Sequence, residues 1–209
     1  MHTVLDSARG GRWLRGAAAA VAARQAELTA LDAAIGDGDH GTNLHRGFTA
    51  VVRSLAADPP SSPGPVLSAA GSTLISTVGG ACGPLYGSAL RAVGRVLDAP
   101  QAGAPEVAAA LEAALAAVQD LGGAQVGDKT MVDAFAPAVA AFRVSAGDGL
   151  PVASRAAADA ARAGARATLP LVARKGRASY LGERSAGHLD PGAVSTALLF
   201  DALAEACTA

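Results

Sequence analysis

Apolar residues recur at helical spacing along nearly the whole chain. Residues separated by three, four or seven positions share one face of a helix, as Leu14, Val21 and Leu28 do in a first helix from about Leu14 to Ala34. Similar segments cover about 41–57, 66–77, 85–96, 105–118, 131–142, 152–173 and 191–203. Because no segment shows a convincing strand-like alternation, the pattern predicts an all-α fold of eight amphipathic helices.

The boundaries between these helices carry recognisable signals. The segment DPPSSPGP, from Asp58 to Pro65, reads as a linker after the second helix. Asp190 followed by Pro191 suits the cap and first position of the last helix. If neighbouring helices alternate in direction, the junctions before the second, fourth, sixth and eighth helices lie at one end of the bundle.

Composition narrows the fold further. A chain of 209 residues can bury one good-sized core, so we expect residues 1–209 to form a single domain. Apolar residues make up 51% of the chain but aromatic residues only 3%. A core of Ala, Leu and Val favours closely packed helices over sheets.

Charge and cysteine content exclude several classes of protein. A net charge of −1, without a basic stripe, argues against a nucleic-acid partner. Cys82 and Cys207 are too few for a disulfide framework or a zinc site, which favours a reduced, cytoplasmic setting. Arg9, Arg12 and Arg15 before an alanine run imitate a signal peptide, but the run continues into an amphipathic helix, so we expect no export. No stretch is apolar and long enough to span a membrane.

The densest chemistry lies in LDAAIGDGDHGTNLHRGF, from Leu31 to Phe48. Asp32, Asp37 and Asp39 offer carboxylate oxygens that one bend can gather, and such ligands suit Mg²⁺ or Ca²⁺. The next residues open a helix, whose N-terminal N–H groups attract phosphate while the carboxylates repel it. Divalent cations resolve this conflict, so the stretch predicts a metal-bridged nucleotide di- or triphosphate. The alternative is an acidic surface loop at a helix junction.

Two motif matches in this stretch are set aside. Gly36, Gly38 and Gly41 fit the dinucleotide fingerprint GxGxxG, but a helical rather than a strand pattern precedes them. An EF-hand starting at Asp37 would place Gly41 at a ligand position and Thr42 where the glycine belongs.

Three other junctions between predicted helices are rich in functional residue types. They are GGACGPLYG (79–87), GDKTM (127–131) and KGRASYLGERSAGHLDPG (175–192). Both lysines, both tyrosines and the only internal methionine fall within them. A glycine-rich turn alone has a plain structural explanation, but a long charged loop is usually functional or disordered. The set predicts one end of the bundle with acids, metal, glycines and bases together.

These motifs, in this order, resemble the nucleotide-binding L subunit of dihydroxyacetone kinase and the homologous C-terminal domain of the single-chain, ATP-dependent kinases. The matching segments LDAAIGDGDHGTN, GGACGPLYG, GDKTM and KGRASYLGERSAGHLDPGA span most of the chain. The resemblance implies a barrel of eight antiparallel amphipathic helices with the nucleotide at one end.

The resemblance also implies the site. Asp32, Asp37 and Asp39 would bind two Mg²⁺ ions that hold the phosphates of ADP or ATP. The family usually has serine where Cys82 stands. The side chain here therefore offers no hydroxyl to a phosphate, although the backbone N–H remains. No residue is assigned as catalytic, and Lys129 is open to a structural or a catalytic interpretation. The nucleotide-binding residues would be His40, Gly41, Thr42, Asn43, Ala81, Cys82, Gly122, Met131, Arg177, Asp190, Pro191 and Gly192.

The implied function is phosphoryl transfer from Mg-bound nucleotide to dihydroxyacetone. In such kinases a separate K subunit or domain holds the sugar covalently through a histidine. A phosphohistidine-carrying M-type protein of the phosphotransferase system would rephosphorylate bound ADP with phosphate from phosphoenolpyruvate. The resemblance leaves a homodimer open. The alternatives are an ATP-dependent kinase subunit for another small ketose, a non-catalytic nucleotide sensor and a structural helical bundle.

Overall fold

The helical stripes of the sequence fold as helices in the computed structural model, which describes residues 3–58 and 60–208. Within these residues there are nine α-helices and two short 3₁₀ helices. They are α1 (Ser7–Ala23), α2 (Gln25–Ile35), α3 (His40–Ala57), α4 (Pro63–Thr77), α5 (Cys82–Val96), α6 (Ala104–Gly122), α7 (Val132–Ser145), η1 (Ala146–Asp148), α8 (Leu150–Ala167), η2 (Arg177–Ser185) and α9 (Pro191–Thr208).

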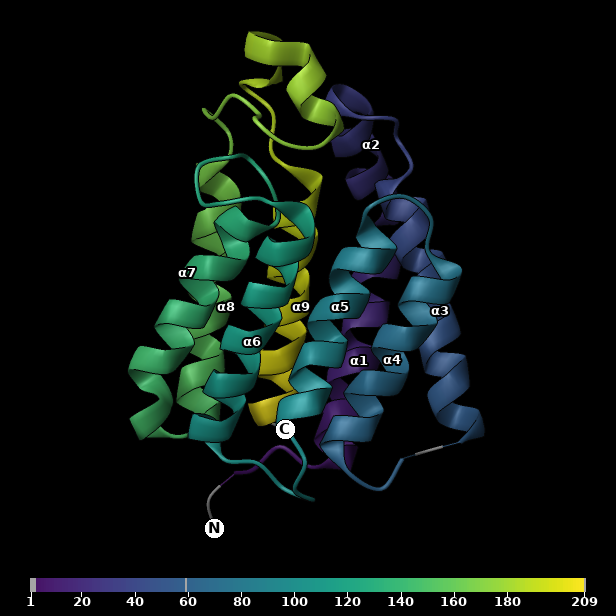
Figure 1. Ribbon diagram of the computed structural model, residues 1–209, viewed down its shortest axis with the longest axis vertical. Helices are drawn as coiled ribbons and strands as arrows, with labels where there is room; N and C mark the ends of the chain where they lie inside the picture. Colours follow the sequence, from purple (N-terminus) through teal and green to yellow (C-terminus); the bar gives the residue numbers. More distant parts are fainter. Residues whose placement is uncertain (1–2, 59, 209) are drawn as a thin grey trace.

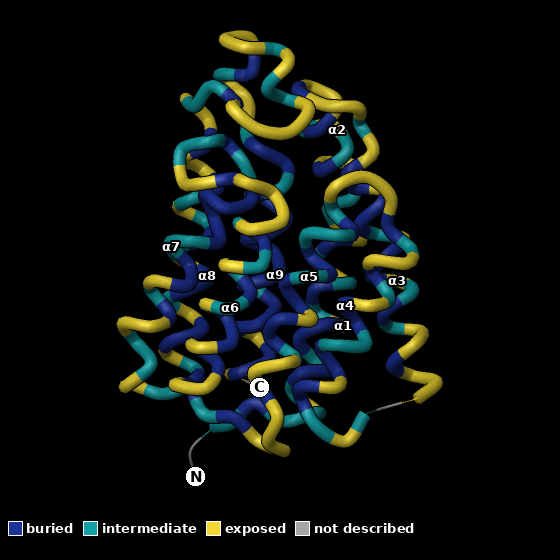
Figure 2. Tube along the Cα trace, in the orientation of Figure 1, coloured by how far each residue is buried: buried dark blue, intermediate teal, exposed yellow. Residues whose placement is uncertain are grey.

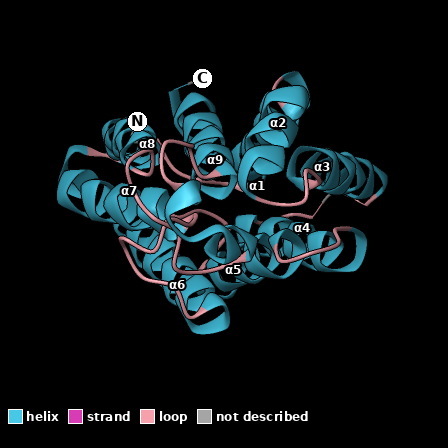
Figure 3. Cartoon of the chain, turned by 90° about the horizontal axis from the view of Figure 1, so that it is seen from above, coloured by secondary structure: helices cyan, strands magenta, loops and turns pink. Residues whose placement is uncertain are grey.

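Eight of these helices close into a ring. From α3 to α9 each helix packs against the next in the chain, and α1 packs against both α3 and α9 (Figures 1 and 3). The helix faces that point into the ring are buried, and the outer faces are exposed (Figure 2). This arrangement confirms the predicted all-α barrel. The only β-type pairing among the described residues is an isolated bridge between Leu5 and Ala102.

The first predicted helix is divided in two. At Arg24 the backbone leaves the helical region, with φ −112° and ψ 16°, and α2 begins as a separate helix. A Cβ atom on Gly41 would lie 2.2 Å from the Gln25 carbonyl oxygen, so glycine lets α3 pack directly against the start of α2. The apolar spacing continues through Leu28 and Ile35, so periodicity alone does not reveal the break.

The seventh predicted helix ends earlier than its pattern suggested. We expected it to reach about Ala173, but α8 ends at Ala167. Pro170 explains the difference, since proline disfavours helical geometry at the residue before it and lacks a backbone N–H. The end of α8 lies beside α9, which places the intervening loop next to the other loops at that end (Figure 1).

Helices α4 and α5 touch backbone to backbone through two pairs of glycines. A Cβ atom on Gly71 would lie 2.5 Å from the Gly87 carbonyl oxygen, and one on Gly87 would lie 2.7 Å from that of Gly71. Gly64 and Gly94 form the same reciprocal contact one heptad away, at 2.7 and 2.5 Å. Larger residues would push the helices apart, so these glycines fix the position of the loop that joins α4 to α5.

Replacing Gly71 with alanine should therefore destabilise the fold by about 2 kcal/mol, because the new methyl group must displace backbone atoms. Urea unfolding would measure the loss. Gly147→Ala is the matched control, since a Cβ atom there meets nothing within 4 Å and φ is not positive. Equal stability of the two variants would show that α4 and α5 can separate without cost.

In the part of the chain that the structure describes, no helix combines the length and the apolar character needed to cross a membrane.

Candidate functional site

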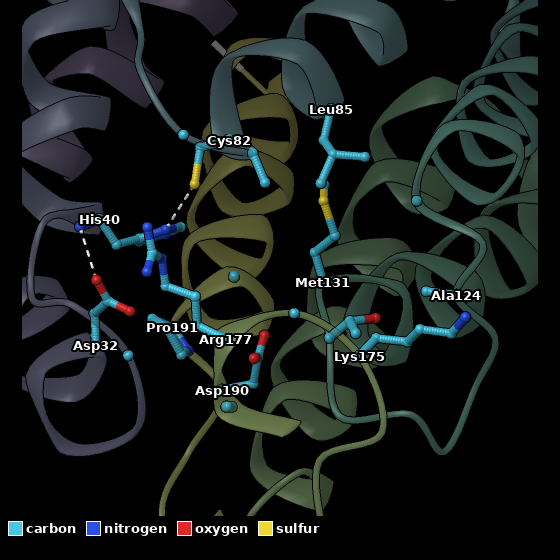
Figure 4. Close-up of a pocket in the computed structure, with 18 of the residues that line it drawn as sticks. Asp32, His40, Cys82, Leu85, Ala124, Met131, Lys175, Arg177, Asp190 and Pro191 are labelled. Atoms are coloured by element: carbon cyan, nitrogen blue, oxygen red, sulfur yellow. Dashed lines mark hydrogen bonds between the residues drawn. The ribbon is translucent and has the colours of Figure 1, made fainter. Parts of the chain in front are cut away.

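Four helix junctions meet around a cavity of about 390 Å³ at one end of the ring (Figure 4). Its walls come from the segments between α2 and α3, α4 and α5, α6 and α7, and α8 and α9. These are the junctions that the sequence predicted would share one end. The cavity therefore collects the chemically dense segments of the chain in one place.

The acidic part of the cavity is built around Asp32. Asp32 is buried near the end of α2, and its Oδ2 accepts hydrogen bonds from the Asp39 N–H at 2.8 Å and the His40 N–H at 3.1 Å. A Cβ atom on Gly36 would lie only 2.2 Å from Asp32 Oδ1, and Gly38 has a positive φ of 74°. The alternation of glycine and aspartate therefore lets the bend fold around the Asp32 carboxylate.

This bend gathers the three predicted metal ligands. One carboxylate oxygen each from Asp32, Asp37 and Asp39 lies within 4.8 Å of the others, while Asp37 and Asp39 are exposed. Such a set of hard oxygen donors fits Mg²⁺, which keeps several of its own waters or phosphate oxygens. The residues present thus suit a divalent cation, and the cation would offset the negative charge of the three acids.

Arg177 reaches the same cluster from η2. Its Nε lies 2.8 Å from Asp37 Oδ2, and the side chains of Arg177 and Asp37 are 69% and 38% exposed. An exposed ion pair of this kind contributes little to stability because water and salt screen it. Its consequence is positional, since it places a guanidinium at the acidic side of the cavity.

His40 lies at the centre of a buried polar network behind the acids. Its Nδ1 is 2.9 Å from Cys82 Sγ (Figure 4), and its Nε2 is 2.8 Å from Ser195 Oγ. The Tyr86 hydroxyl lies 2.7 Å from Ser195 Oγ and 2.8 Å from Thr196 Oγ1, and it donates to the Gly192 carbonyl at 3.0 Å. The network ties α3 and α5 to the first two turns of α9.

Burial sets the protonation of this network. It lowers the pKa of His40, against the opposing charges of Asp32 and Asp39, so the imidazole is neutral at neutral pH. Burial also raises the pKa of the Tyr86 hydroxyl, which therefore stays protonated. The network therefore adds no charge of its own to this side of the cavity.

Cys82 should react slowly with alkylating reagents, because burial and the nearby carboxylates raise the pKa of its thiol to about 12. Burial raises the pKa of Cys207 to about 11, so the same holds there. Mass spectrometry after iodoacetamide treatment at pH 8 would show little modification of the folded protein and full modification in denaturant. Cys82→Ser isolates the signal of Cys207. Rapid alkylation of Cys82 in the folded protein would contradict a protonated thiol.

The junction before α9 is capped as predicted. Asp190 Oδ2 accepts the Ala193 N–H at 2.7 Å, and Pro191 opens the helix. The Asp190 N–H donates to Thr168 Oγ1 at 3.0 Å, which joins this turn to the end of α8. Burial raises the pKa of Asp190 to about 7, while the Ala193 N–H and the Lys129 ammonium act in the opposite direction.

The cavity wall on the side of α5, α6 and α7 is mostly apolar, with Lys129 and Thr130 as its polar members. In Figure 4 the side chains of Leu85 and Met131 point toward one another, with Ala124 and Lys175 at the edge. The apolar wall is completed by Val118, Gly122 and Val132. A flat, weakly polar group fits between such surfaces, whereas charged groups fit the acidic side.

Most predicted nucleotide-binding residues line the cavity, and three do not. Gly41, Thr42 and Asn43 lie in the first turn of α3, beside the cavity rather than on its wall. Gly41 packs on α2, Thr42 is exposed, and Asn43 Oδ1 accepts a hydrogen bond from Arg46 Nη2 at 2.9 Å. The predicted residues on the wall are His40, Ala81, Cys82, Gly122, Met131, Arg177, Asp190, Pro191 and Gly192.

Other residues that shape the site were not assigned from the sequence. Asp133 is buried and accepts the N–H groups of Gly127 at 2.6 Å and Thr130 at 2.7 Å, which orders the GDKTM loop. The spacing of Thr130 and Asp133 follows a capping pattern and could have revealed this role. Ser195 and Thr196 gave no such signal, because they sit within an otherwise apolar helix.

Comparison with known proteins places the chain in a family. The DAK2 domain family matches residues 34–205, and the chain belongs to this family. It is 40% identical to the ADP-binding subunit DhaL of PEP-dependent dihydroxyacetone kinase 1 from Listeria innocua, over 92% of each chain. It is 44% identical to the ADP-binding subunit DhaL of the Escherichia coli PEP-dependent enzyme, over 85% of this chain and 86% of that one.

Longer relatives contain the same unit. L-erythrulose 1-kinase from Mycolicibacterium smegmatis is 42% identical over 88% of this chain, which covers 33% of that protein. The crystal structure of the C. freundii dihydroxyacetone kinase in complex with AMP-PNP and Mg²⁺ superposes with a TM-score of 0.72 at 31% identity, over 93% of this chain and 33% of that chain. The ring of helices is thus a module found both alone and within larger kinases.

Proposed function

We propose that this chain is the nucleotide-binding subunit of a dihydroxyacetone kinase, with residues 1–209 acting as one domain. The observation that carries the proposal is the cluster of Asp32, Asp37 and Asp39 at one side of a cavity whose other side is apolar. Such a cavity suits a nucleotide, with its base on the apolar wall and its phosphates on metal ions at the acids. Similarity to ADP-binding DhaL subunits along most of both chains supports the same assignment.

The three aspartates would hold two Mg²⁺ ions, and these would bind the phosphates of ADP or ATP. When bound, the metals supply positive charge that offsets charge on the transferring phosphoryl group. Arg177, at the same side of the cavity, adds a cationic side chain. Leu85 and Met131 would receive the base between them.

The chain itself contributes positioning and charge rather than a proton-transfer group. Phosphoryl transfer proceeds mainly through alignment and electrostatic stabilisation, so no general base is needed on this side of the reaction. His40 is buried, and both of its ring nitrogens are hydrogen-bonded, to Cys82 and Ser195, so it is not available as a general base. The acceptor sugar would be held by a separate K subunit that docks over the cavity and binds dihydroxyacetone covalently through a histidine.

The phosphoryl donor distinguishes two versions of this function. In the first, ADP stays bound and a phosphohistidine-carrying M-type protein rephosphorylates it with phosphate derived from phosphoenolpyruvate. The PEP-dependent relatives, similar to this chain along almost their full length, favour this version. In the second, ATP binds and leaves as ADP, and the sugar is another small ketose. Similarity to L-erythrulose 1-kinase supports that alternative.

The test combines the purified chain with a K subunit and dihydroxyacetone under two conditions. One condition supplies excess ATP alone, and the other supplies phosphoenolpyruvate with the phosphotransfer proteins. Retained ADP after purification, and turnover only in the second condition, would support the first version. Multiple turnovers with ATP alone would support the second. Nucleotide binding without turnover in either condition would instead favour a non-catalytic sensor.

A further inference from the structure

Lys129, in the loop between α6 and α7, has an unusual backbone conformation. Its φ of 61° is the only positive φ of a non-glycine residue in segments 3–58 and 60–208. Side chains that carry a Cβ atom avoid this region, so the surrounding structure must hold Lys129 there. Strain of this kind is retained where a side chain must be placed at a particular point.

The side chain of Lys129 is also buried to an unusual degree. Only 1% of the residue is exposed. Across the described part of the chain no carboxylate forms an ion pair with its ammonium. Burying a charge without a direct counter-ion is unfavourable, and burial accordingly lowers the pKa of Lys129 while Asp190 and Asp133 oppose it. The position of this ammonium therefore requires two unfavourable features, a positive φ at Lys129 and a buried charge without a direct counter-ion.

The ammonium joins two segments that come from beyond α7. Lys129 Nζ donates to the Thr168 carbonyl, at the end of α8, at 2.7 Å, and to the His188 carbonyl, two residues before Asp190. The Thr168 hydroxyl donates to the Ala165 carbonyl at 2.7 Å and accepts the Asp190 N–H at 3.0 Å. Thr168 thus receives one hydrogen bond from Lys129 and one from the turn that begins α9.

Lys129 itself lines the cavity, while the Thr168 and His188 carbonyls that it holds lie behind the wall. Asp190, Pro191 and Gly192 line the cavity, and a Cβ atom on Gly192 would lie 3.4 Å from the Cβ of Met131. Met131 follows Lys129 by two residues. The same short loop therefore supplies Met131 to the apolar wall and Lys129 to the tether that holds the adjacent turn.

We propose that Lys129 is a positioning residue, which fixes the turn Asp190–Gly192 for ligand binding by tethering the Thr168 and His188 carbonyls. The proposal rests on the proposed nucleotide site, because that site gives the turn its ligand. Lys129 acts through the tethered backbone and need not touch the nucleotide or the phosphoryl group. Of the two roles open to Lys129 from the sequence, structural and catalytic, the proposal assigns it a structural role that serves ligand binding.

Two substitutions separate the ammonium from the backbone conformation. Lys129→Met keeps most of the length of the side chain, one atom short, and removes its charge and its hydrogen bonds. Lys129→Gly removes the side chain but suits a positive φ, so it relieves the backbone strain. If the tether matters, both variants lose affinity for the nucleotide, because both lack the ammonium. If only the loop conformation matters, Lys129→Gly behaves like the unchanged protein.

Phe142→Leu provides a matched control for loss of stability. Phe142 is fully buried near the end of α7, away from the cavity, so its truncation weakens the core without touching the tether. The three variants and the unchanged chain are compared by calorimetry with ADP and Mg²⁺. Hydrogen exchange of residues 186–194 is followed in the ligand-free proteins.

Both Lys129 variants should bind Mg-ADP about 10-fold to 100-fold more weakly and exchange faster at residues 186–194. Phe142→Leu should lower the urea midpoint and leave Kd and local exchange unchanged. Unchanged exchange and affinity in Lys129→Met, or full affinity in Lys129→Gly, would overturn the proposal. If the unchanged chain fails to bind Mg-ADP, the nucleotide function fails instead, and the exchange data alone decide whether Lys129 orders the turn.

Discussion

Replacing Asp37 with alanine should lower the rate of phosphoryl transfer about 10³-fold, because it removes one ligand of the metal ions that hold the phosphates. The metal-free protein should keep its stability. Asp37 is exposed, and its contact with Arg177 is an exposed ion pair that contributes little to folding. Turnover with a K subunit and urea unfolding would measure the two effects.

Two other aspartates serve as comparisons for this variant. Asp148→Ala, at an exposed position in η1, should leave the rate unchanged. Asp32→Ala should reduce both rate and stability, because Asp32 also accepts the N–H groups of Asp39 and His40. If Asp37→Ala unfolds the metal-free protein, or retains full turnover, Asp37 is not a metal ligand of the kind proposed.

Mg²⁺ and ADP together should raise the melting temperature strongly. A ligand present at about 1,000 times its Kd stabilises the folded state by about 4 kcal/mol. For a chain of this length that corresponds to a shift of about 8–16 °C. The ligand would connect the ends of several helices around the cavity, which gives the shift its structural basis.

Differential scanning calorimetry would measure this shift with Mg²⁺ alone, with ADP in EDTA and with both. Only the combination should give the large shift in the unchanged chain, and Asp37→Ala should lose most of it. A large shift with ADP in EDTA would show that the nucleotide binds without the metal.

The helical fold could be predicted from the sequence because the spacing of apolar residues depends only on residues close together in the chain. The stripe through Leu14, Val21 and Leu28, for example, predicted a buried helix face, and all three residues are buried in the structure. The division at Arg24 was not readable, because the spacing continues across it. The end of α8 at Ala167 was missed because the helical pattern was extended past Pro170, the residue that signals a helix end there.

The site was predictable to the extent that it is local in sequence. Asp32, Asp37 and Asp39 lie within eight residues, so their proximity follows from one bend. The partners of His40 and Lys129 lie far along the chain, and only the closed ring brings Ser195 to one and Thr168 to the other. Residue type alone left both side chains without an assigned partner.

The central claim is that divalent metal bound by the three aspartates carries the nucleotide. Isothermal titration calorimetry of ADP into the purified chain, in Mg²⁺ and in EDTA, tests it most directly. Without metal, the phosphates would face the carboxylates of Asp32, Asp37 and Asp39, so affinity should fall at least about 100-fold. The same Kd in Mg²⁺ and EDTA would contradict this claim, because the nucleotide would then bind without a metal ion at the acids.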